Sequence, residues 1–105
     1  MAVRVVWSTD AADDLERVAE FIARDSPRYA KTVVAKVVEA TRRLALFPRS
    51  GRVVPEVEDE SFREVLVYSY RVLYRIEEDV VTIAAVAHSR QSLAIDDLSS
   101  DDSPN

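Results

Sequence analysis

The chain has 105 residues but no cysteine, one glycine, one histidine and no apolar run long enough to cross a membrane. Without cysteine it forms neither a disulfide nor a thiolate zinc site, which favours a reducing, cytoplasmic setting. Its longest apolar stretches, such as residues 81–87, fall far short of the ~20 residues of a transmembrane helix. The N-terminal residues also lack the apolar core of a signal peptide. We therefore expect a cytoplasmic protein that has no membrane association and needs no metal or other cofactor.

Charge is distributed unevenly along the chain. The net charge at pH 7 is −5, but four aspartates lie in the last ten residues, which leaves −1 for residues 1–95. Hydrophobic residues make up 48% of the chain, enough for one core. We predict a single domain over residues 1–95 and an acidic, disordered tail over 96–105. Such a nearly neutral domain is not expected to bind nucleic acid sequence-specifically, because affinity for phosphates needs many cationic contacts.

Two amphipathic helices are predicted in the first half of the chain. Residues 3–7 are typical of a short strand, and Ser8 can cap a helix that follows. Pro27 is favoured at the start of a second helix, which we expect to end at Phe47 because Pro48 disfavours helical angles in the residue before it. The apolar positions of each helix repeat every three or four residues, as one buried face requires: Ala11, Leu15, Val18 and Ile22, then Ala30, Val34, Val37, Thr41 and Leu44.

The only glycine lies in the segment FPRSGRVVPE, residues 47–56. A tight reversal after the second helix would need a positive φ angle, which glycine adopts without strain, so we predict a turn with positive φ at Gly51. The residues after it are typical of an extended chain, and Pro55 has no amide hydrogen to donate to a neighbouring strand. This segment is therefore predicted to run along the edge of a sheet.

Three β-rich runs follow, at residues 62–68, 70–76 and 80–89. The acidic residues between the second and third runs suit a short hairpin loop. The middle run has a period of two, which indicates a sheet packed on one side: Tyr70, Val72, Tyr74 and Ile76 on one face, and Arg71, Leu73 and Arg75 on the other. We expect the helices to cover the tyrosine face and leave the arginine face open. The fold class is therefore α+β, with a strand, an α-helical hairpin and an antiparallel β-meander in two layers.

Three pieces of the sequence carry a family resemblance: WSTDAADDLERVAEFI near the start, LFPRSGRVVPE in the middle, and REVLVYSYRVLYRI with VAHSR near the end. In this order they resemble the ParE/RelE superfamily of bacterial toxins, and in particular ParE-like members of the plasmid-stabilisation type, from Val3 to about Arg90. The resemblance implies the two-layer toxin fold. It also implies a toxin of a type II toxin–antitoxin module, neutralised by a cognate antitoxin.

This superfamily acts in at least two ways, because RelE-like members cut messenger RNA on the ribosome whereas ParE-like members inhibit DNA gyrase by binding. Metal-free RNA cleavage needs a base, cations and a donor for the leaving oxygen. A RelE-like site would draw these groups from the following residues: Arg63, Arg71, Arg75, His88 and Arg90. No tyrosine follows them, and no lysine follows Lys36. We therefore expect a gyrase inhibitor without catalytic residues; the alternatives are a RelE-like ribonuclease and a member that only binds its antitoxin.

The arginine-bearing face is the predicted partner-binding surface. Its cations would meet acidic side chains of the antitoxin, with an apolar residue between them: Arg63, Arg71, Leu73, Arg75 and Arg90. His88 and Ser89 are not expected to form a base–nucleophile pair, because adjacent residues of a strand point to opposite faces.

Overall fold

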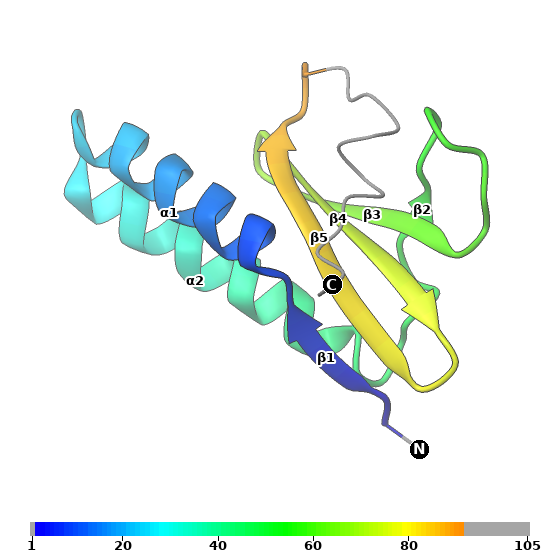
Figure 1. The fold of residues 1–105 in the computed structure, drawn as a ribbon. Helices are drawn as coiled ribbons and strands as arrows, with labels where there is room; N and C mark the ends of the chain where they lie inside the picture. The colour runs from blue at the N-terminus through cyan, green and yellow to red at the C-terminus, as the bar shows by residue number, and fades with distance from the viewer. Residues whose placement is uncertain (1, 92–105) are drawn as a thin grey trace.

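The computed structural model describes residues 2–91. One strand precedes a helical hairpin, and four strands follow it (Figure 1): β1 Arg4–Trp7, α1 Thr9–Ala23, α2 Pro27–Arg43, β2 Arg52–Val53, β3 Phe62–Val67, β4 Tyr70–Glu77 and β5 Val80–His88. The predicted α+β class and order of elements are confirmed. The tail predicted at 96–105 lies outside the described residues. Within residues 2–91, neither helix is both long and apolar enough to cross a bilayer.

Both helices begin at the predicted caps. The Ser8 hydroxyl accepts a hydrogen bond from the Ala11 amide at 3.0 Å, and the Ser26 hydroxyl accepts one from the Tyr29 amide at 3.1 Å. The prediction that α2 continues to Phe47 is wrong, because α2 ends at Arg43. The amides of residues 44–46 each bond three residues back rather than four, which tightens the chain into turns before Pro48 is reached.

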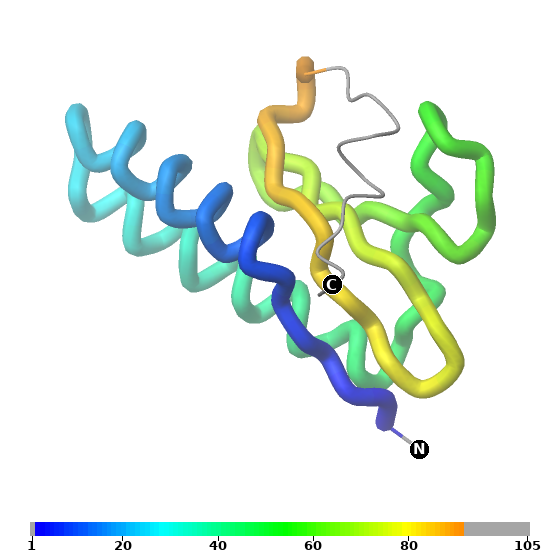
Figure 2. Tube along the Cα trace, viewed as in Figure 1, coloured from blue at the N-terminus to red at the C-terminus, as the bar shows by residue number. Residues whose placement is uncertain are grey.

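The five strands form one mixed sheet in the order β1-β5-β4-β3-β2. Strands β3, β4 and β5 make the predicted antiparallel meander, and β2 lies at the edge as the proline after it predicts. The sequence did not predict a partner for β1, which pairs in parallel with β5, from Arg4 opposite Val80 to Trp7 opposite Ile83. The first and last strands therefore lie side by side, with the helical hairpin against one face of the sheet (Figure 2).

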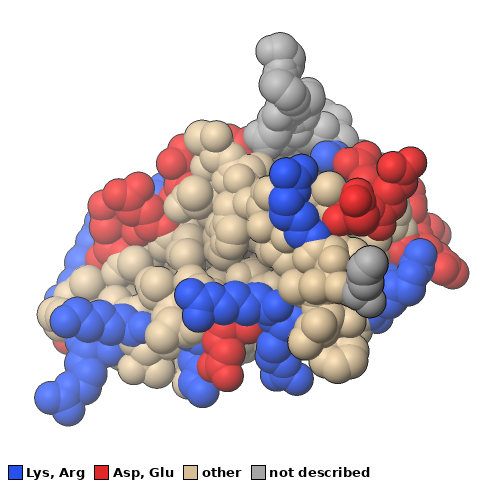
Figure 3. Space-filling model, turned by 90° about the horizontal axis from the view of Figure 1, so that it is seen from below, with Lys and Arg blue, Asp and Glu red and all other residues tan. Residues whose placement is uncertain are grey.

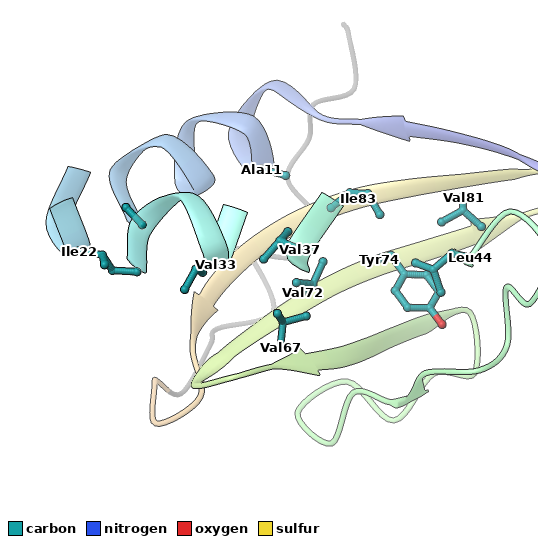
Figure 4. Packing of buried hydrophobic residues seen from close by; sticks show 11 residues of the cluster. Ala11, Ile22, Val33, Val37, Leu44, Val67, Val72, Tyr74, Val81 and Ile83 are labelled. Atoms are coloured by element: carbon teal, nitrogen blue, oxygen red, sulfur yellow. The ribbon is translucent and has the colours of Figure 1, made fainter. Parts of the chain in front are cut away.

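The larger core lies between the helices and the sheet (Figure 4). Its buried side chains come from both helices, the segment after α2 and three strands: Ala11, Ile22, Ala30, Val33, Val37, Leu44, Val67, Val72, Tyr74, Val81 and Ile83. On α2 the buried residue is Val33 rather than the predicted Val34. The reason is that the buried row of α2 starts from Ala30 with a step of three residues and continues to Val37 with a step of four.

The opposite face of the sheet is not open, contrary to the prediction. A second, smaller core covers it, with two further side chains packed against it: Val54, Leu73, Ala85 and Ala87, then Val57 and Phe62. The segment between β2 and β3 supplies part of this core, held by a hydrogen bond from the Val54 amide to the Phe62 carbonyl at 3.0 Å. Leu73 pairs with Ala85, just before the sheet register shifts between Leu73 and Tyr74, and both side chains belong to this second core. Leu73 is therefore buried and does not offer a contact to a partner.

Candidate functional site

Arg71 lies at the centre of a network of ion pairs on this second face. Its guanidinium donates to both carboxylate oxygens of Glu56, at 2.8 Å and 2.7 Å, and its Nε lies 2.6 Å from Oε1 of Glu64. Its Nη1 also donates to the Gln91 carbonyl at 3.0 Å. Only 6% of the side chain is exposed, and the hydrogen bonds with Glu56 raise the pKa of the guanidinium. The prediction that Arg71 lies on an open face is wrong, because the segment before β3 folds over it.

Glu64 joins two arginines in this network. Its side chain is fully buried, and it accepts hydrogen bonds from Arg71 and, at 2.6 Å, from Nε of Arg52. A buried carboxylate is tolerated only when it is paired and hydrogen-bonded, so the network is first of all a structural one. The sequence does not indicate this role, since a glutamate within a strand is ordinarily exposed.

Gly51 does not have a positive φ angle, so that prediction is wrong. The position needs glycine because of a close approach: an added Cβ would lie 2.6 Å from the Glu64 carbonyl oxygen and 2.6 Å from the Tyr74 hydroxyl. The Tyr74 hydroxyl accepts from the Gly51 amide at 2.9 Å and donates to the Pro48 carbonyl at 2.7 Å. The turn after α2 is therefore fastened directly to β4, which leaves no room for a side chain.

Arg63 supports the same turn. Its Nη1 donates to the carbonyls of Gly51 at 3.0 Å and Arg49 at 3.3 Å, and its Nε donates to the carbonyl of Glu60 at 2.9 Å. Arg75 is less constrained, because a third of its side chain is exposed and its Nε lies 3.6 Å from the Glu77 carboxylate. Of the three arginines predicted on the strands, Arg75 is therefore the most accessible to a partner.

His88 lies at the exposed end of β5. It pairs across the sheet with Tyr70, whose ring meets the imidazole edge-on with 5.6 Å between centroids. Its Nδ1 accepts a hydrogen bond from the amide of Arg90, an exposed residue, at 3.1 Å. Burial raises the pKa of the Tyr70 phenol. The alternation of residues 70–76 indicates only a core position for Tyr70, and nothing in the sequence connects this residue with His88.

The nominated residues do not converge on one site. Arg71 pairs with Ala87 and His88 pairs with Tyr70, so the guanidinium and the imidazole point to opposite faces of the sheet. Arg63 lies opposite Tyr74. Tyr74 is separated from Tyr70 by about 13 Å along β4 at the usual rise of a strand. Among residues 2–91, moreover, no group of three His, Cys, Asp or Glu side chains could hold a metal ion.

A hollow beside His88 is lined by acidic residues of α1. Among them, Asp14 reaches across to β5, where its carboxylate accepts a hydrogen bond from the Val86 amide at 3.0 Å. Within residues 2–91, this part of β5 has no strand beside it on that edge, because the pairing with β1 ends at Ile83. Burial raises the pKa of Asp14, and the hydrogen bond from Val86 and the charge of Arg17 offset part of that rise. Asp14 therefore covers an open strand edge with a partly buried charge.

We expect the Asp14→Asn variant to be at least as stable as the parent near pH 7. A folded-state pKa above the ordinary 3.8 means that the folded protein binds the proton more tightly than the unfolded chain. The parent therefore gains stability as the pH falls through the folded-state pKa and loses it as the pH rises. Asparagine keeps the acceptor for Val86 without the charge. Urea unfolding near pH 7 and near pH 4.5 measures the free energies of unfolding of the parent and the variant. An increase in the stability of the variant relative to the parent from pH 7 to pH 4.5 would contradict the prediction.

Comparison with known proteins identifies the family. Residues 5–93 match the family described as the ParE toxin of the type II toxin–antitoxin system, parDE. The chain is 34% identical over 90 residues to the Y4kP protein of Sinorhizobium fredii, which covers 84% of this chain and 90% of that protein. It is 28% identical over 86 residues to Toxin RelE2 of Caulobacter vibrioides, covering 82% of this chain and 94% of the relative.

Solved structures share the fold. The chromosomal ParDE toxin–antitoxin system from P. aeruginosa matches with a TM-score of 0.68 at 19% identity, over 83% of this chain and 96% of the matched chain. The RelBE2 toxin–antitoxin complex from Mycobacterium tuberculosis matches with a TM-score of 0.59 at 27% identity, over 84% and 99%. With the family match spanning both helices and all five strands, the chain belongs to the ParE toxin family of type II toxin–antitoxin systems, within the ParE/RelE superfamily.

Proposed function

We propose that this toxin inhibits DNA gyrase by binding, in the cytoplasm, and that a cognate antitoxin neutralises it. The observation that carries the proposal is the dispersal of the residues that a ribonuclease would need. Arg71 is held by two carboxylates, and Arg63 by the carbonyls of a turn. Neither guanidinium is free to stabilise the charge that builds on a phosphate during cleavage.

The imidazole of His88 is also poorly suited to act as a general base. A neutral imidazole has one nitrogen with a free lone pair, and the other nitrogen carries the proton. Here the lone pair of Nδ1 accepts a hydrogen bond from the Arg90 amide, so in the neutral imidazole the proton is on Nε2. This supports binding rather than bond cleavage as the action of the toxin.

The antitoxin is proposed from the relatives. The matched structures come from a ParDE toxin–antitoxin system and a RelBE2 toxin–antitoxin complex. A chain of the same family and fold is expected to have a partner of the same kind, bound through a surface that carries exposed apolar and charged side chains.

A comparison of two activities tests the proposal. One toxin preparation is added to a supercoiling assay with purified gyrase and to a ribosome-dependent messenger cleavage assay, and we expect inhibited supercoiling with intact message. His88→Ala should change the inhibition by no more than about two-fold, since loss of a general base typically costs 10² to 10⁴ in rate. Arg75→Ala or Arg90→Ala should weaken the inhibition, because these cations are accessible to a target.

The alternative is a RelE-like ribonuclease. The observation that favours it is the contact between His88 and Tyr70, which brings two proton-exchanging groups together at one end of the sheet. Cleaved message that is abolished by His88→Ala, with unaffected supercoiling, would replace the gyrase proposal. Failure of both assays with intact antitoxin binding would identify a member that only binds its antitoxin.

A further inference from the structure

The hollow beside His88 lies between one side of α1 and the end of β5. On β5 it is lined by residues 84–87, three of which are alanines, and these small side chains leave open space in front of the helix. We call this depression the α1–β5 hollow. Its lining residues on α1 recur every three or four positions, so they form one stripe along the helix: Asp10, Asp13, Asp14, Arg17, Val18 and Phe21.

Negative charge dominates this hollow. Three carboxylates and one guanidinium line it, which leaves an excess of two negative charges. Asp14 and Arg17 pair with each other, whereas Asp10 and Asp13 are exposed and have no ion pair within residues 2–91. Helix α1 as a whole contains five acidic residues and one basic residue, and α2 contains five basic residues and one acidic residue. Figure 3 shows a similar segregation on one face of the molecule, where most Lys and Arg lie along the lower margin and most Asp and Glu along the upper one.

An exposed aromatic ring lies at the other end of the stripe. Phe21 is 63% exposed, and the guanidinium carbon of Arg24 lies 5.9 Å from the centroid of its ring. Aromatic rings attract cations and are enriched in protein interfaces. The hollow therefore offers an apolar surface for the stem of a lysine or arginine side chain and carboxylates for its charged end.

The length of the stripe indicates the size of the occupant. Asp10 and Phe21 are about 16 Å apart along α1 at 1.5 Å per residue. An extended chain covers that distance with about five residues. The hollow is thus suited to a short segment of a partner protein rather than to a single side chain.

The backbone of β5 beside the hollow already has partners. The Ser8 hydroxyl donates to the Ala84 carbonyl at 3.4 Å, and the Val86 amide donates to the Asp14 carboxylate at 3.0 Å. A segment that added a strand to this edge would have to break both hydrogen bonds. The hollow is therefore expected to recognise the side chains of a partner and not its backbone.

The charge of the hollow determines which partner fits. An acidic segment would be repelled, and residues 92–105 of this chain, with four aspartates and no lysine or arginine, have that composition. An enzyme that acts on DNA, by contrast, exposes lysine and arginine side chains that contact phosphates. The hollow also reaches His88 and Gln91, on either side of Arg90, the cation that we expect to contact gyrase.

We propose that the α1–β5 hollow receives a lysine- or arginine-bearing segment of DNA gyrase, whose cations meet Asp10 and Asp13 and whose apolar atoms pack against Phe21. The inference rests on the gyrase inhibition proposed above. It assigns to α1 a part of the surface that meets the target, in addition to the end of β5.

The test measures the binding of the full-length toxin to purified gyrase and the inhibition of supercoiling. Asp13→Lys reverses an exposed charge of the hollow and Phe21→Ala removes the exposed ring, so each should raise the dissociation constant about ten-fold or more. Glu20→Lys is the matched control, because it makes the same charge reversal at an exposed position of α1 that does not line the hollow. It should change the dissociation constant less than about three-fold.

Two further measurements accompany the binding assay. Added salt should weaken the binding of the parent more than that of Asp13→Lys, because salt screens the charge pairs that this variant lacks. All three variants replace exposed side chains, so their melting temperatures should stay close to that of the parent and confirm that they fold.

The outcomes separate the hollow from the proposed function. If the parent toxin neither binds gyrase nor inhibits supercoiling, the proposed function fails and this inference fails with it. If the parent inhibits gyrase and both hollow variants inhibit it equally well, the proposed function stands and the hollow is not the surface that meets gyrase. Variants that inhibit gyrase normally but lose antitoxin binding, or lose self-association in sedimentation, would assign the hollow to the antitoxin or to a second copy of the chain and overturn the inference.

Discussion

Replacing Arg71 with methionine is expected to lower the free energy of unfolding by about 3 kcal/mol. The substitution leaves Glu64 with a fully buried carboxylate and removes one of its two cationic partners. It also removes the hydrogen bonds of Arg71 with the Glu56 carboxylate and with the Gln91 carbonyl, so that the segment before β3 and the end of the described chain each lose one anchor. This loss of stability is at the low end of the range for a broken buried ion pair, because Arg52 still contacts Glu64 in the variant.

Arg75→Met is the matched control for this prediction. Arg75 lies on the same strand, is more exposed, and has one ion pair at 3.6 Å, so its loss should cost no more than about 1 kcal/mol. A second variant, Arg71→Met with Glu64→Gln, should recover part of the stability because it removes the buried charge. Equal losses at Arg71 and Arg75 in urea unfolding would show that the network does not hold the fold.

Gly51→Ala is expected to destabilise the protein by about 2 to 3 kcal/mol, the upper part of the range for overpacked sites, and Gly51→Val by at least as much. The new methyl group would lie 2.6 Å from the Glu64 carbonyl oxygen. That oxygen belongs to the backbone of β3 and cannot swing aside as a flexible side chain can. The turn would therefore have to move, breaking the hydrogen bonds that the Tyr74 hydroxyl makes with Gly51 and Pro48.

Thermal and urea unfolding of the Gly51 variants provide the measurement. Arg49→Ala changes an exposed side chain of the same turn, so it should shift the unfolding free energy by only about 0.5 kcal/mol. Tyr74→Phe removes the hydroxyl that receives the turn, and it should make the Gly51→Ala substitution less costly because one of the two close contacts is gone. An alanine variant as stable as the parent would mean that the turn has room for a side chain.

Apolar periodicity predicted the two helices but not the end of α2, residue type predicted their caps, and β-rich composition predicted the three long strands. The alternation in β4 correctly assigned Val72 and Tyr74 to the helix-covered face. The same alternation assigned Arg71 and Leu73 to the opposite face of the sheet. It could not show that this opposite face is covered as well. The covering residues, Val57 among them, are scattered through a proline-containing segment that has no period of its own.

The candidate site was harder to predict than the fold. An arginine on a strand looks the same in the sequence whether it meets solvent or two carboxylates, since its partners, Glu56 and Glu64, are set by tertiary contacts. The single glycine marked a constrained position, yet the constraint is the close approach of the Glu64 carbonyl oxygen and the Tyr74 hydroxyl, and not the backbone angle.

The pairing of β1 with β5 determines when the sheet can be completed during protein synthesis. Strand β1 is made before the helices and the other strands of the sheet, and its partner residues, Val80 to Ile83, are made only after them. At about 5 to 20 residues per second, β1 waits roughly 4 to 15 s for them. The larger core stays incomplete over the same interval, because Val81 and Ile83 belong to it. A chain that ends before β5 therefore lacks both the partner of β1 and part of the larger core, so the toxin fold can form only after β5 has been made.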